Sequence, residues 1–205
     1  MLMKNQSVYD ALKSKVPLHS LAYCYELWER YPFKLKITKS RKSKLGDYRF
    51  DSILKIHQIS VNGDLNPYAF LITFIHEVAH LLVKLNNRRQ LPPHGVVWKT
   101  TFKAVFQPLL NGQVFPEQVL SPLLKYMKNP KASSYADQNL MMALRNYDLN
   151  KINRPVLGDL EIGDTFKINN RVFKKGETKR TRVLCQEVKS RRKYLIPKIA
   201  EVECL

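Results

Sequence analysis

The most constraining feature of this sequence is the run from Tyr68 to Leu85, which is mostly apolar and contains neither glycine nor proline. Pro67 precedes it, where a proline suits the first turn of a helix, and Asn86-Asn87 follows as a stop signal. The run therefore predicts a helix of about five turns. Because so apolar a helix must be covered on several sides, the rest of the chain has to build a core around it.

Shorter patterns predict the elements that would supply this cover. The spacing of apolar residues predicts two helices between Ser7 and Arg30, divided at Pro17. Strands are expected at 33–38, 48–50 and 57–61, with a turn at Gly46-Asp47, and further helices at 97–106, 117–127 and around 137–146. Beyond Pro155, short strands are expected at 166–168, 171–173, 181–185 and 193–196. Turns at Asn169-Asn170, Lys175-Gly176 and Lys189-Ser190 would join them.

This order of elements predicts the α+β class. Helices and a short antiparallel sheet would surround the long helix in residues 1–128. Residues 129–155 are polar and weakly patterned, which predicts a linker with one short helix. Residues 156–205 would form a small β module with seven core residues: Phe166, Ile168, Phe173, Val183, Leu184, Leu195 and Ile196.

The charge predicts a polyanionic partner. Lys and Arg number 35 and Asp and Glu 17, a difference of +18, although 44% of the residues are hydrophobic, as in a folded protein. Nucleic acid is the expected partner, single-stranded or damaged DNA in particular. No membrane partner is expected, because His76 and Glu77 interrupt the longest apolar stretches and no amphipathic helix rich in Trp, Leu and Lys occurs.

The candidate nucleic-acid contacts are basic side chains in two regions, with Phe173 and Tyr194 as candidate stacking partners for unpaired bases. They are Lys42, Lys44, Lys174, Lys175, Lys179, Arg180, Arg182, Arg191, Arg192 and Lys193. Charge runs of this kind are solvated surface in most proteins, and the size of the summed charge is what favours the nucleic-acid interpretation.

The N-terminus and the cysteines predict a cytoplasmic protein, including one associated with the nucleoid. Residues 1–10 lack the cationic start and apolar core of a signal peptide. Cys24, Cys185 and Cys204 have no CxxC spacing and suggest no disulfide framework, which fits a reducing compartment.

The chemistry of the chain is concentrated in His76-Glu77-Val78-Ala79-His80, inside the long predicted helix. Residues four apart lie on one helical face, so the two imidazoles can converge on one Zn²⁺ ion. Glu77 stands beside them, where its carboxylate can deprotonate a water on the metal. A lone histidine on an apolar helix is usually only packed, and His19 and His57, which have no partner at ligand spacing, are interpreted in that way.

His94 is the candidate third ligand, since a hydrolytic zinc needs three protein ligands and an open position. It follows Pro92-Pro93, which stiffens the backbone, and precedes Gly95, which would let the chain turn close to the metal. An acidic third ligand is excluded nearby, because no Asp or Glu occurs between Ala79 and Glu117.

These residues resemble the SprT-like zinc metallopeptidases, which include the Spartan proteases that degrade proteins crosslinked to DNA. The resemblance rests on the His76–His80 motif and on His94-Gly95-Val96-Val97-Trp98-Lys99. It is supported by Leu45-Gly46-Asp47-Tyr48-Arg49 upstream and by the basic segment 176–185, which resembles the hairpin of a zinc-ribbon tail. It covers residues 18–106 well and the tail in part, and the tail lacks the four zinc-ribbon cysteines, so no second zinc is expected.

The resemblance implies a zincin-like fold and a zinc-dependent endopeptidase that acts on DNA-associated or DNA-crosslinked protein. Zn²⁺ would be held by His76, His80 and His94, with Glu77 as the catalytic base. Tyr48 and Arg49 are candidate oxyanion donors, and Trp98 is expected to pack against the metal helix. Two alternatives remain open: a non-proteolytic, zinc-containing nucleic-acid-binding protein, and a zinc hydrolase of a non-peptide bond.

Overall fold

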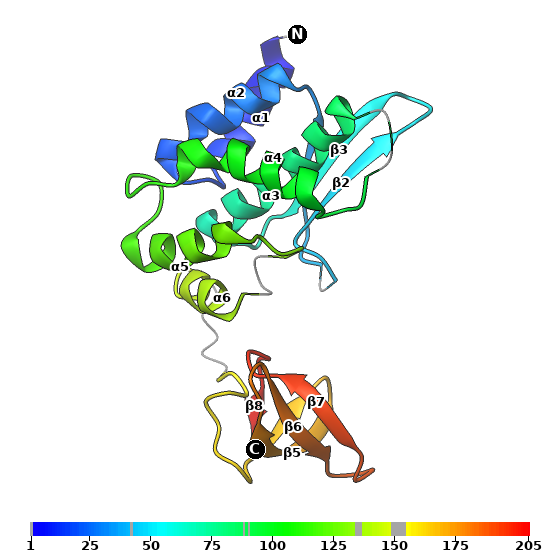
Figure 1. Ribbon diagram of the computed structural model, residues 1–205, viewed down its shortest axis with the longest axis vertical. Coiled ribbons are helices and arrows are strands. Elements are labelled where there is room, and N and C mark those ends of the chain that lie inside the picture. Colours follow the sequence, from blue (N-terminus) through cyan, green and yellow to red (C-terminus); the bar gives the residue numbers. More distant parts are fainter. Residues whose placement is uncertain (1, 42, 88, 90, 134–136, 149–154) are drawn as a thin grey trace. The chain divides into compact units, whose positions relative to one another are not determined.

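The computed structural model divides the chain into two compact units, residues 1–149 and 150–205, and each is described by itself (Figure 1). The residues described are 2–41, 43–87, 89, 91–133, 137–148 and 155–205. Within these residues the fold is α+β, with six α-helices, a three-stranded mixed sheet and a five-stranded antiparallel sheet. The predicted class is confirmed.

The helices of the first unit lie close to their predicted positions. They are α1 (Leu2–Lys13), α2 (Leu21–Arg30), α3 (Pro67–Asn86), α4 (Val96–Phe106), α5 (Glu117–Lys128) and α6 (Gln138–Arg145). Pro17 separates α1 from α2, as its ring and missing N–H predict, and a short 3₁₀ turn at Leu18–Ser20 leads into α2.

The sheet of the first unit corrects a prediction. Its strands are β1 (Lys34–Thr38), β2 (Gly46–Asp51) and β3 (Ile56–Asn62), in the order β1-β3-β2. β2 and β3 form the expected antiparallel hairpin, but β1 pairs parallel to β3, so the sheet is mixed rather than antiparallel. Alternation along a strand reports which face is wet and says nothing about direction, which is why the sequence did not reveal this pairing.

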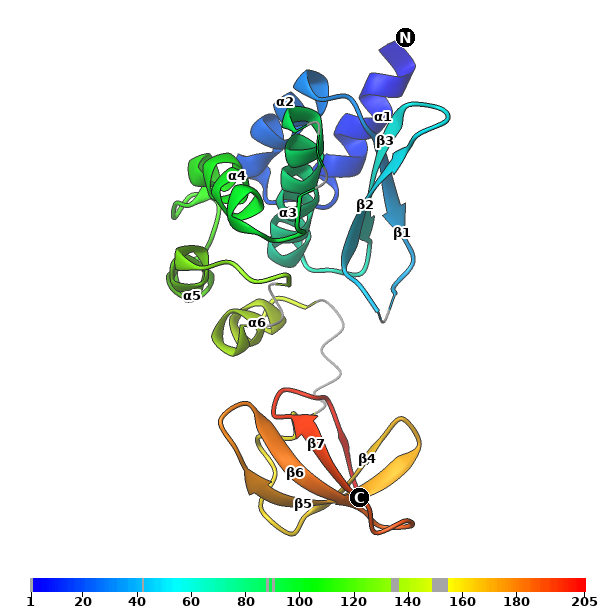
Figure 2. The ribbon, with the colours of Figure 1, turned by 45° about the vertical axis from the view of Figure 1, so that its right-hand side comes forward.

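Helix α3 lies at the centre of the first unit, between the sheet and α4 (Figure 2). The buried Asn66 caps it, because its side-chain oxygen accepts hydrogen bonds from the N–H groups of Tyr68 and Ala69. By length and composition α3 is apolar enough to cross a membrane, but 72% of that apolar window is buried inside the fold, as in a core helix. The helix thus carries its histidines into the core.

Much of the expected linker belongs to the first unit. The side-chain amide of Asn66 donates to the Leu144 carbonyl at 2.8 Å and to Asp148 at 2.6 Å, which ties α6 to the start of α3. Leu140 and Leu144 are buried in the same core. The polar composition of residues 129–148 concealed this packing, because the few apolar side chains of α6 suffice to dock a short amphipathic helix.

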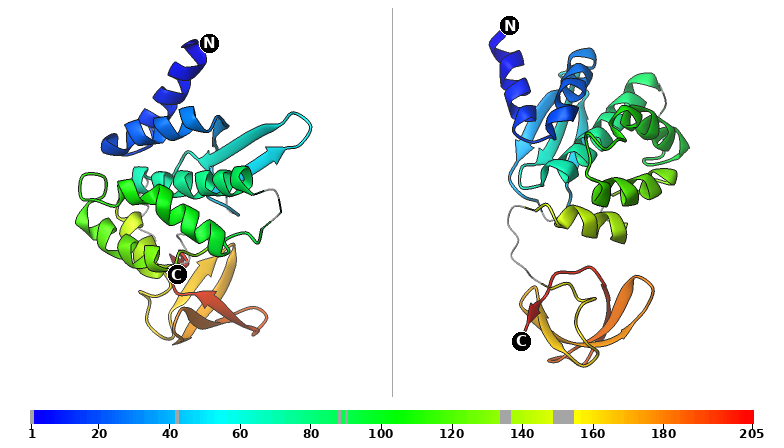
Figure 3. Two further views of the ribbon diagram at one scale, coloured as in Figure 1. Left: turned by 45° about the horizontal axis from the view of Figure 1, so that its top comes forward. Right: turned by 90° about the vertical axis from the view of Figure 1, so that its left-hand side faces the viewer.

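The second unit, here called the β module, is one curled sheet (Figure 3). Its strands are β4 (Thr165–Ile168), β5 (Arg171–Thr178), β6 (Arg182–Glu187), β7 (Lys193–Pro197) and β8 (Glu203–Cys204), in the order β7-β6-β5-β4-β8. The predicted Asn169-Asn170 turn has φ angles of 48° and 62°, the left-handed pair that a two-residue hairpin needs. The turn predicted at Lys175-Gly176 is wrong, because β5 runs through these residues to Thr178, with a register irregularity between Lys175 and Thr178.

The register of the β module corrects its predicted core. Leu184 pairs with Leu195 on the face opposite to Val183 and Cys185, and Leu195 is 48% exposed. One residue of offset reverses the face of a strand side chain, so these two leucines point outward. The buried cluster comprises Leu157, Phe166, Phe173, Val183, Cys185 and Val202.

Candidate metal centre

One turn of α3 brings the first two candidate ligands together. His76 and His80 lie four residues apart, their Nε2 atoms are 3.1 Å apart and their ring centroids 4.9 Å. This is the convergence that the helical spacing predicts.

The loop before α4 brings His94 to the same point. Its Nε2 lies 3.0 Å from the Nε2 of His76 and 3.0 Å from that of His80. The left-handed backbone conformation falls on His94 itself, with φ of 59°, whereas Gly95 has φ of −70° and caps α4. The tight turn expected at Gly95 is therefore made one residue earlier, by a residue type that tolerates it better than most.

These three nitrogens fit a metal ion. Three neutral imidazole nitrogens cannot all satisfy one another, because each is either a donor of one hydrogen or an acceptor. Tetrahedral ligands at the usual Zn–N length of about 2.0–2.1 Å lie about 3.3 Å apart, close to the observed separations. In the part of the chain that the structure describes, this group contains three ligand atoms and no fourth. The cluster could therefore hold a metal ion through three imidazoles.

Trp98 forms one wall of the histidine cluster. Its ring centroid lies 4.6, 5.3 and 4.7 Å from those of His76, His80 and His94, and it stacks on Phe102 at 4.9 Å. Its Nε1 is buried without a hydrogen-bond partner among the described residues. The expected packing role is confirmed, and the indole restricts the orientation of all three imidazoles.

The histidines are held in the neutral form that a metal requires. Burial, followed by the neighbouring histidines, lowers the pKa of His76 to about 3. Burial and then His94 lower the pKa of His80 to about 4, and burial also lowers the pKa of His94. At neutral pH each ring can therefore offer a lone pair without first losing a proton.

Glu77 is buried beside the cluster, where β2 approaches α3 most closely. A cavity of about 350 Å³ is lined by both Glu77 and His76, together with Lys44, Gly46 and Thr73. A Cβ atom added to Gly46 would lie 2.7 Å from Oε1 of Glu77 and 2.6 Å from the Thr73 side chain. Because Gly46 has no side chain, the backbone of β2 can pass close to the Glu77 carboxyl group. Gly46 begins β2 and does not form the predicted turn.

The environment of Glu77 tunes its acidity. Burial, and then the charge of Asp47, raise its pKa to about 8, against the opposing effects of the Tyr48 backbone N–H, which donates to it, and of Arg41 and Lys44. A carboxyl group with a pKa near the working pH suits both accepting and returning a proton.

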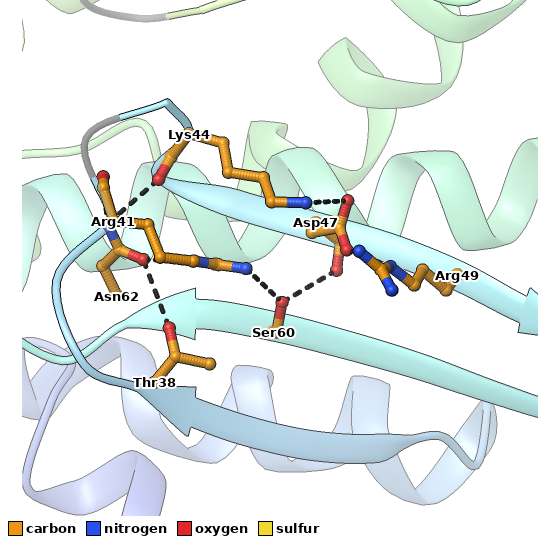
Figure 4. Close-up of polar contacts among 7 residues, drawn as sticks. All are labelled: Thr38, Arg41, Lys44, Asp47, Arg49, Ser60 and Asn62. Atoms are coloured by element: carbon orange, nitrogen blue, oxygen red, sulfur yellow. Dashed lines mark hydrogen bonds and ion pairs between the residues drawn. The ribbon is translucent and has the colours of Figure 1, made fainter.

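A polar network on the far face of the sheet fixes the segment that precedes Gly46 (Figure 4). Arg41 donates from Nε to Asn62 at 2.7 Å and from Nη1 to Ser60 at 3.1 Å, while Asn62 donates to the Lys44 carbonyl at 3.0 Å. Lys44 pairs with Asp47 at 3.0 Å. Because these charges act on the pKa of Glu77, the loop between β1 and β2 belongs to the electrostatics of the site.

The candidate oxyanion donors are engaged elsewhere. The Tyr48 hydroxyl lies 2.8 Å from Nδ1 of His57, and Arg49 is exposed and pairs with Asp47. Apart from the charge of Asp47, β2 thus contributes its backbone to the site, through the Tyr48 N–H. His57 has a hydroxyl partner and lies outside the metal cluster.

The candidate nucleic-acid residues differ in exposure. Lys42 lies outside the described residues, and Lys44 is occupied by Asp47. Lys175 is 5% exposed and its ammonium donates to the carbonyls of Gly158 and Leu160, so it cannot present its charge to a ligand. Exposed on the β module are Lys174, Lys179, Arg180, Arg182, Arg191, Arg192 and Lys193.

The two candidate stacking residues also differ. Phe173 is 3% exposed and belongs to the core of the β module, which removes it from the surface. Tyr194 is half-buried and packs edge-on against Phe173, with ring centroids 5.7 Å apart. Only Tyr194 of the pair can meet a base.

Sequence reasoning misses two residues that shape the site. Arg41 falls in a basic loop that composition alone places in solvent, although its Nη2 is buried without a partner among the described residues. The capping role of Asn66 is missed too, although an Asn one residue before a proline and a long apolar run is a recognisable helix start.

Comparison with known proteins identifies no relative. No family model, curated protein or solved structure matches the chain. What stands is a cluster of three histidines that could bind a metal ion, in an α+β fold.

Proposed function

We propose that the chain is a zinc-dependent endopeptidase. The observation that carries this proposal is the position of Glu77, whose buried carboxyl group opens on the same cavity as His76 of the three-imidazole cluster. A structural zinc site needs no such carboxyl group. Burying one lowers the stability of the fold, so its presence here favours a functional role.

His76, His80 and His94 would hold the ion. Zinc bound there supplies Lewis acidity and lowers the pKa of a coordinated water to about 7. Glu77 accepts a proton at its carboxylate and returns it to the leaving amine. Its pKa of about 8 in the metal-free chain falls when a cation lies nearby, which makes the carboxylate available as a base. Trp98 keeps the three rings in position.

The edge of β2 supports a peptide as the substrate. The Asn62 N–H donates to the Leu45 carbonyl, so in the alternating antiparallel pattern Asp47 and Arg49 also bond to β3. The backbone N–H and C=O groups of Gly46, Tyr48 and Phe50 then point away from β3, toward the open edge of the sheet. The Tyr48 N–H donates to Glu77 on this edge. An extended peptide can add to such an edge, which favours peptide hydrolysis over another bond.

The substrate that we propose is protein held on DNA, as the resemblance to the SprT-like peptidases implies. The support on the chain itself is electrostatic: residues 165–198 contain twelve Lys and Arg and two Glu. Such a surface confines a protein to nucleic acid through counterion release. We also propose a cytoplasmic location, because the spacing of the cysteines fits a reducing compartment, and association with the nucleoid, because of this basic surface.

The substitution Glu77→Gln tests the peptidase. It keeps the shape of the side chain and removes the base, so we expect zinc content to remain at the wild-type value while cleavage of a DNA-bound protein falls by at least 10²–10⁴-fold. Glu117→Gln, at the exposed start of α5, is the matched control and should cleave normally.

The same assay separates the alternatives. Undiminished cleavage by Glu77→Gln would remove Glu77 from the mechanism. Zinc without any turnover in the wild type, with or without single-stranded DNA, would favour a non-proteolytic nucleic-acid-binding protein.

A further inference from the structure

The curled sheet of the β module has an open end at which aromatic, apolar and cationic side chains meet. In the register of the strands, Arg171 and Phe173 of β5 point to the same face as Glu187 of β6 and Tyr194 of β7. This is the inner face, whose floor is the buried cluster that includes Phe166 and Phe173. Ligand sites commonly form at the mouths of such curled sheets.

A concavity of about 190 Å³ occupies this mouth. It is lined by Ile168, Asn169, Arg171, Phe173, Tyr194 and Ile196. Apart from Phe173, the apolar members of this lining are only partly buried, so they remain accessible. The volume is large enough to hold one flat ring.

Arg171 forms a rigid planar wall of the concavity. Its guanidinium centre lies 4.7 Å from the centroid of Tyr194 and 5.2 Å from that of Phe173. Its Nε donates to Glu187 at 2.6 Å, and Glu187 also accepts from Ser190. The guanidinium therefore lies over both aromatic rings in a cation–π arrangement, and nucleobases stack on arginine planes and aromatic rings of this kind.

The hairpin between β6 and β7 adds exposed cations beside the mouth. Glu187 and Lys193 flank a tip that carries Lys189, Arg191 and Arg192, all exposed. Hydrogen bonds from Arg171 and Ser190 lower the pKa of Glu187, and the charge of Arg192 adds a smaller effect. Because Arg171 is the main partner of Glu187, the charges of Lys189 and Arg191 are available for phosphates, and that of Arg192 is available in part.

We propose that the mouth of the β module binds single-stranded nucleic acid, with one unpaired base against Tyr194 and Arg171 and the adjoining phosphates on the 189–193 tip. A base inside a duplex is stacked and cannot enter a concavity of this kind, which is why the single strand is the occupant. The Asn169 amide on the rim can bond to a base edge. The inference rests on the nucleic-acid part of the proposed function and is independent of zinc.

Fluorescence anisotropy of the full-length protein with a labelled dT12 strand tests the site. Tyr194→Leu keeps the apolar packing and removes the aromatic ring, so we expect the affinity to fall about 5–100-fold, the usual contribution of one stacked base. Tyr194→Phe keeps the ring and should bind within about twofold of wild type. A thermal scan of each variant verifies that the β module remains folded.

A strand with abasic sites supplies the second arm. Wild-type protein should bind it about as weakly as Tyr194→Leu binds dT12, and Tyr194→Leu should no longer distinguish the two strands. Replacing Arg191 and Arg192 with Ala should reduce the salt slope by about 0.7 for each phosphate that the tip no longer neutralises. Arg180→Ala, at the β5–β6 turn, is the charge-matched control for each single tip substitution, Arg191→Ala or Arg192→Ala, and should change the dT12 affinity much less.

Equal binding of dT12 by wild type and a folded Tyr194→Leu variant would overturn the proposal, as would equal wild-type affinity for the abasic strand. A larger loss with Arg180→Ala than with the tip variants would move the interface to the other end of the sheet. Preference for acidic peptides or anionic vesicles over dT12 would also contradict it. None of these outcomes depends on peptidase activity, which Glu77→Gln tests separately.

Discussion

The two units of this protein keep their charged and titratable groups in opposite places. In the first unit three imidazoles and the Glu77 carboxyl group lie largely inside the fold, and the imidazoles pack against Trp98. In the described residues of the β module, Lys175 is the one buried charge, and the remaining basic side chains surround a small core. Chemistry needs groups whose pKa values and positions the core controls, whereas capture of a polyanion needs only an exposed charge on a stable platform.

The largest expected effect is that of removing one buried aromatic side chain from each unit, which should lower the stability of that unit alone. Phe102 and Phe166 are both fully buried, in separate clusters, and a Phe→Ala change in a core costs about 3–5 kcal/mol. We expect calorimetry to resolve two transitions, with Phe102→Ala lowering only that of the first unit, by about 10 °C. Phe166→Ala should abolish the transition of the smaller β module.

Zinc content and single-strand binding report the consequence. Phe166→Ala should retain zinc and lose dT12 binding. Phe102→Ala should retain dT12 binding and lose part of its zinc, because Phe102 packs against Trp98 beside the three histidines. A single transition that both substitutions shift equally would show that the two units do not act separately.

Acidification should produce a smaller effect that is confined to the first unit. All five histidines precede residue 95, and the folded pKa values of His76 and His80, about 3 and 4, lie below the unfolded value of about 6.5. As the pH is lowered from 7 to 5, the unfolded metal-free chain therefore binds protons that the folded chain does not bind. The unfolding free energy of the first unit decreases as a result. Glu77 offsets part of this loss, because its raised pKa lets the folded chain bind one proton more.

Chemical denaturation of the metal-free protein at several pH values measures this slope. The unfolding free energy of the first unit should decrease between pH 7 and 5, while that of the β module, which has no histidine, stays nearly constant. A first unit that becomes more stable over this range would contradict the neutral, buried state of the imidazoles.

Local patterns predicted the elements well where one signal dominated. The run 68–85, with Pro67 before it, predicted α3 almost to the residue, and Asn169-Asn170 predicted a hairpin turn. The cluster of three histidines followed from spacing along α3 and from the lack of acidic alternatives before α5. These features depend on residues close together in sequence.

Properties set by distant contacts could not be predicted in the same way. The parallel pairing of β1 with β3 and the outward direction of Leu184 depend on register, which alternating composition does not encode. Lys175 is predicted as a surface charge because lysine is usually exposed, yet two carbonyls of the 158–160 turn hold it inside. The raised pKa of Glu77 likewise arises from strand β2, thirty residues earlier, approaching at Gly46.

The most direct test of the account is the zinc content of the purified protein and of His94→Ala, after dialysis against a competing chelator. Elemental analysis should find one zinc per chain in the wild type and in the control His57→Ala, whose ring lies outside the cluster. His94→Ala should lose the metal, because two imidazoles bind zinc weakly. Full retention of zinc by His94→Ala, or a wild type that binds none when zinc is supplied, would contradict the proposed centre.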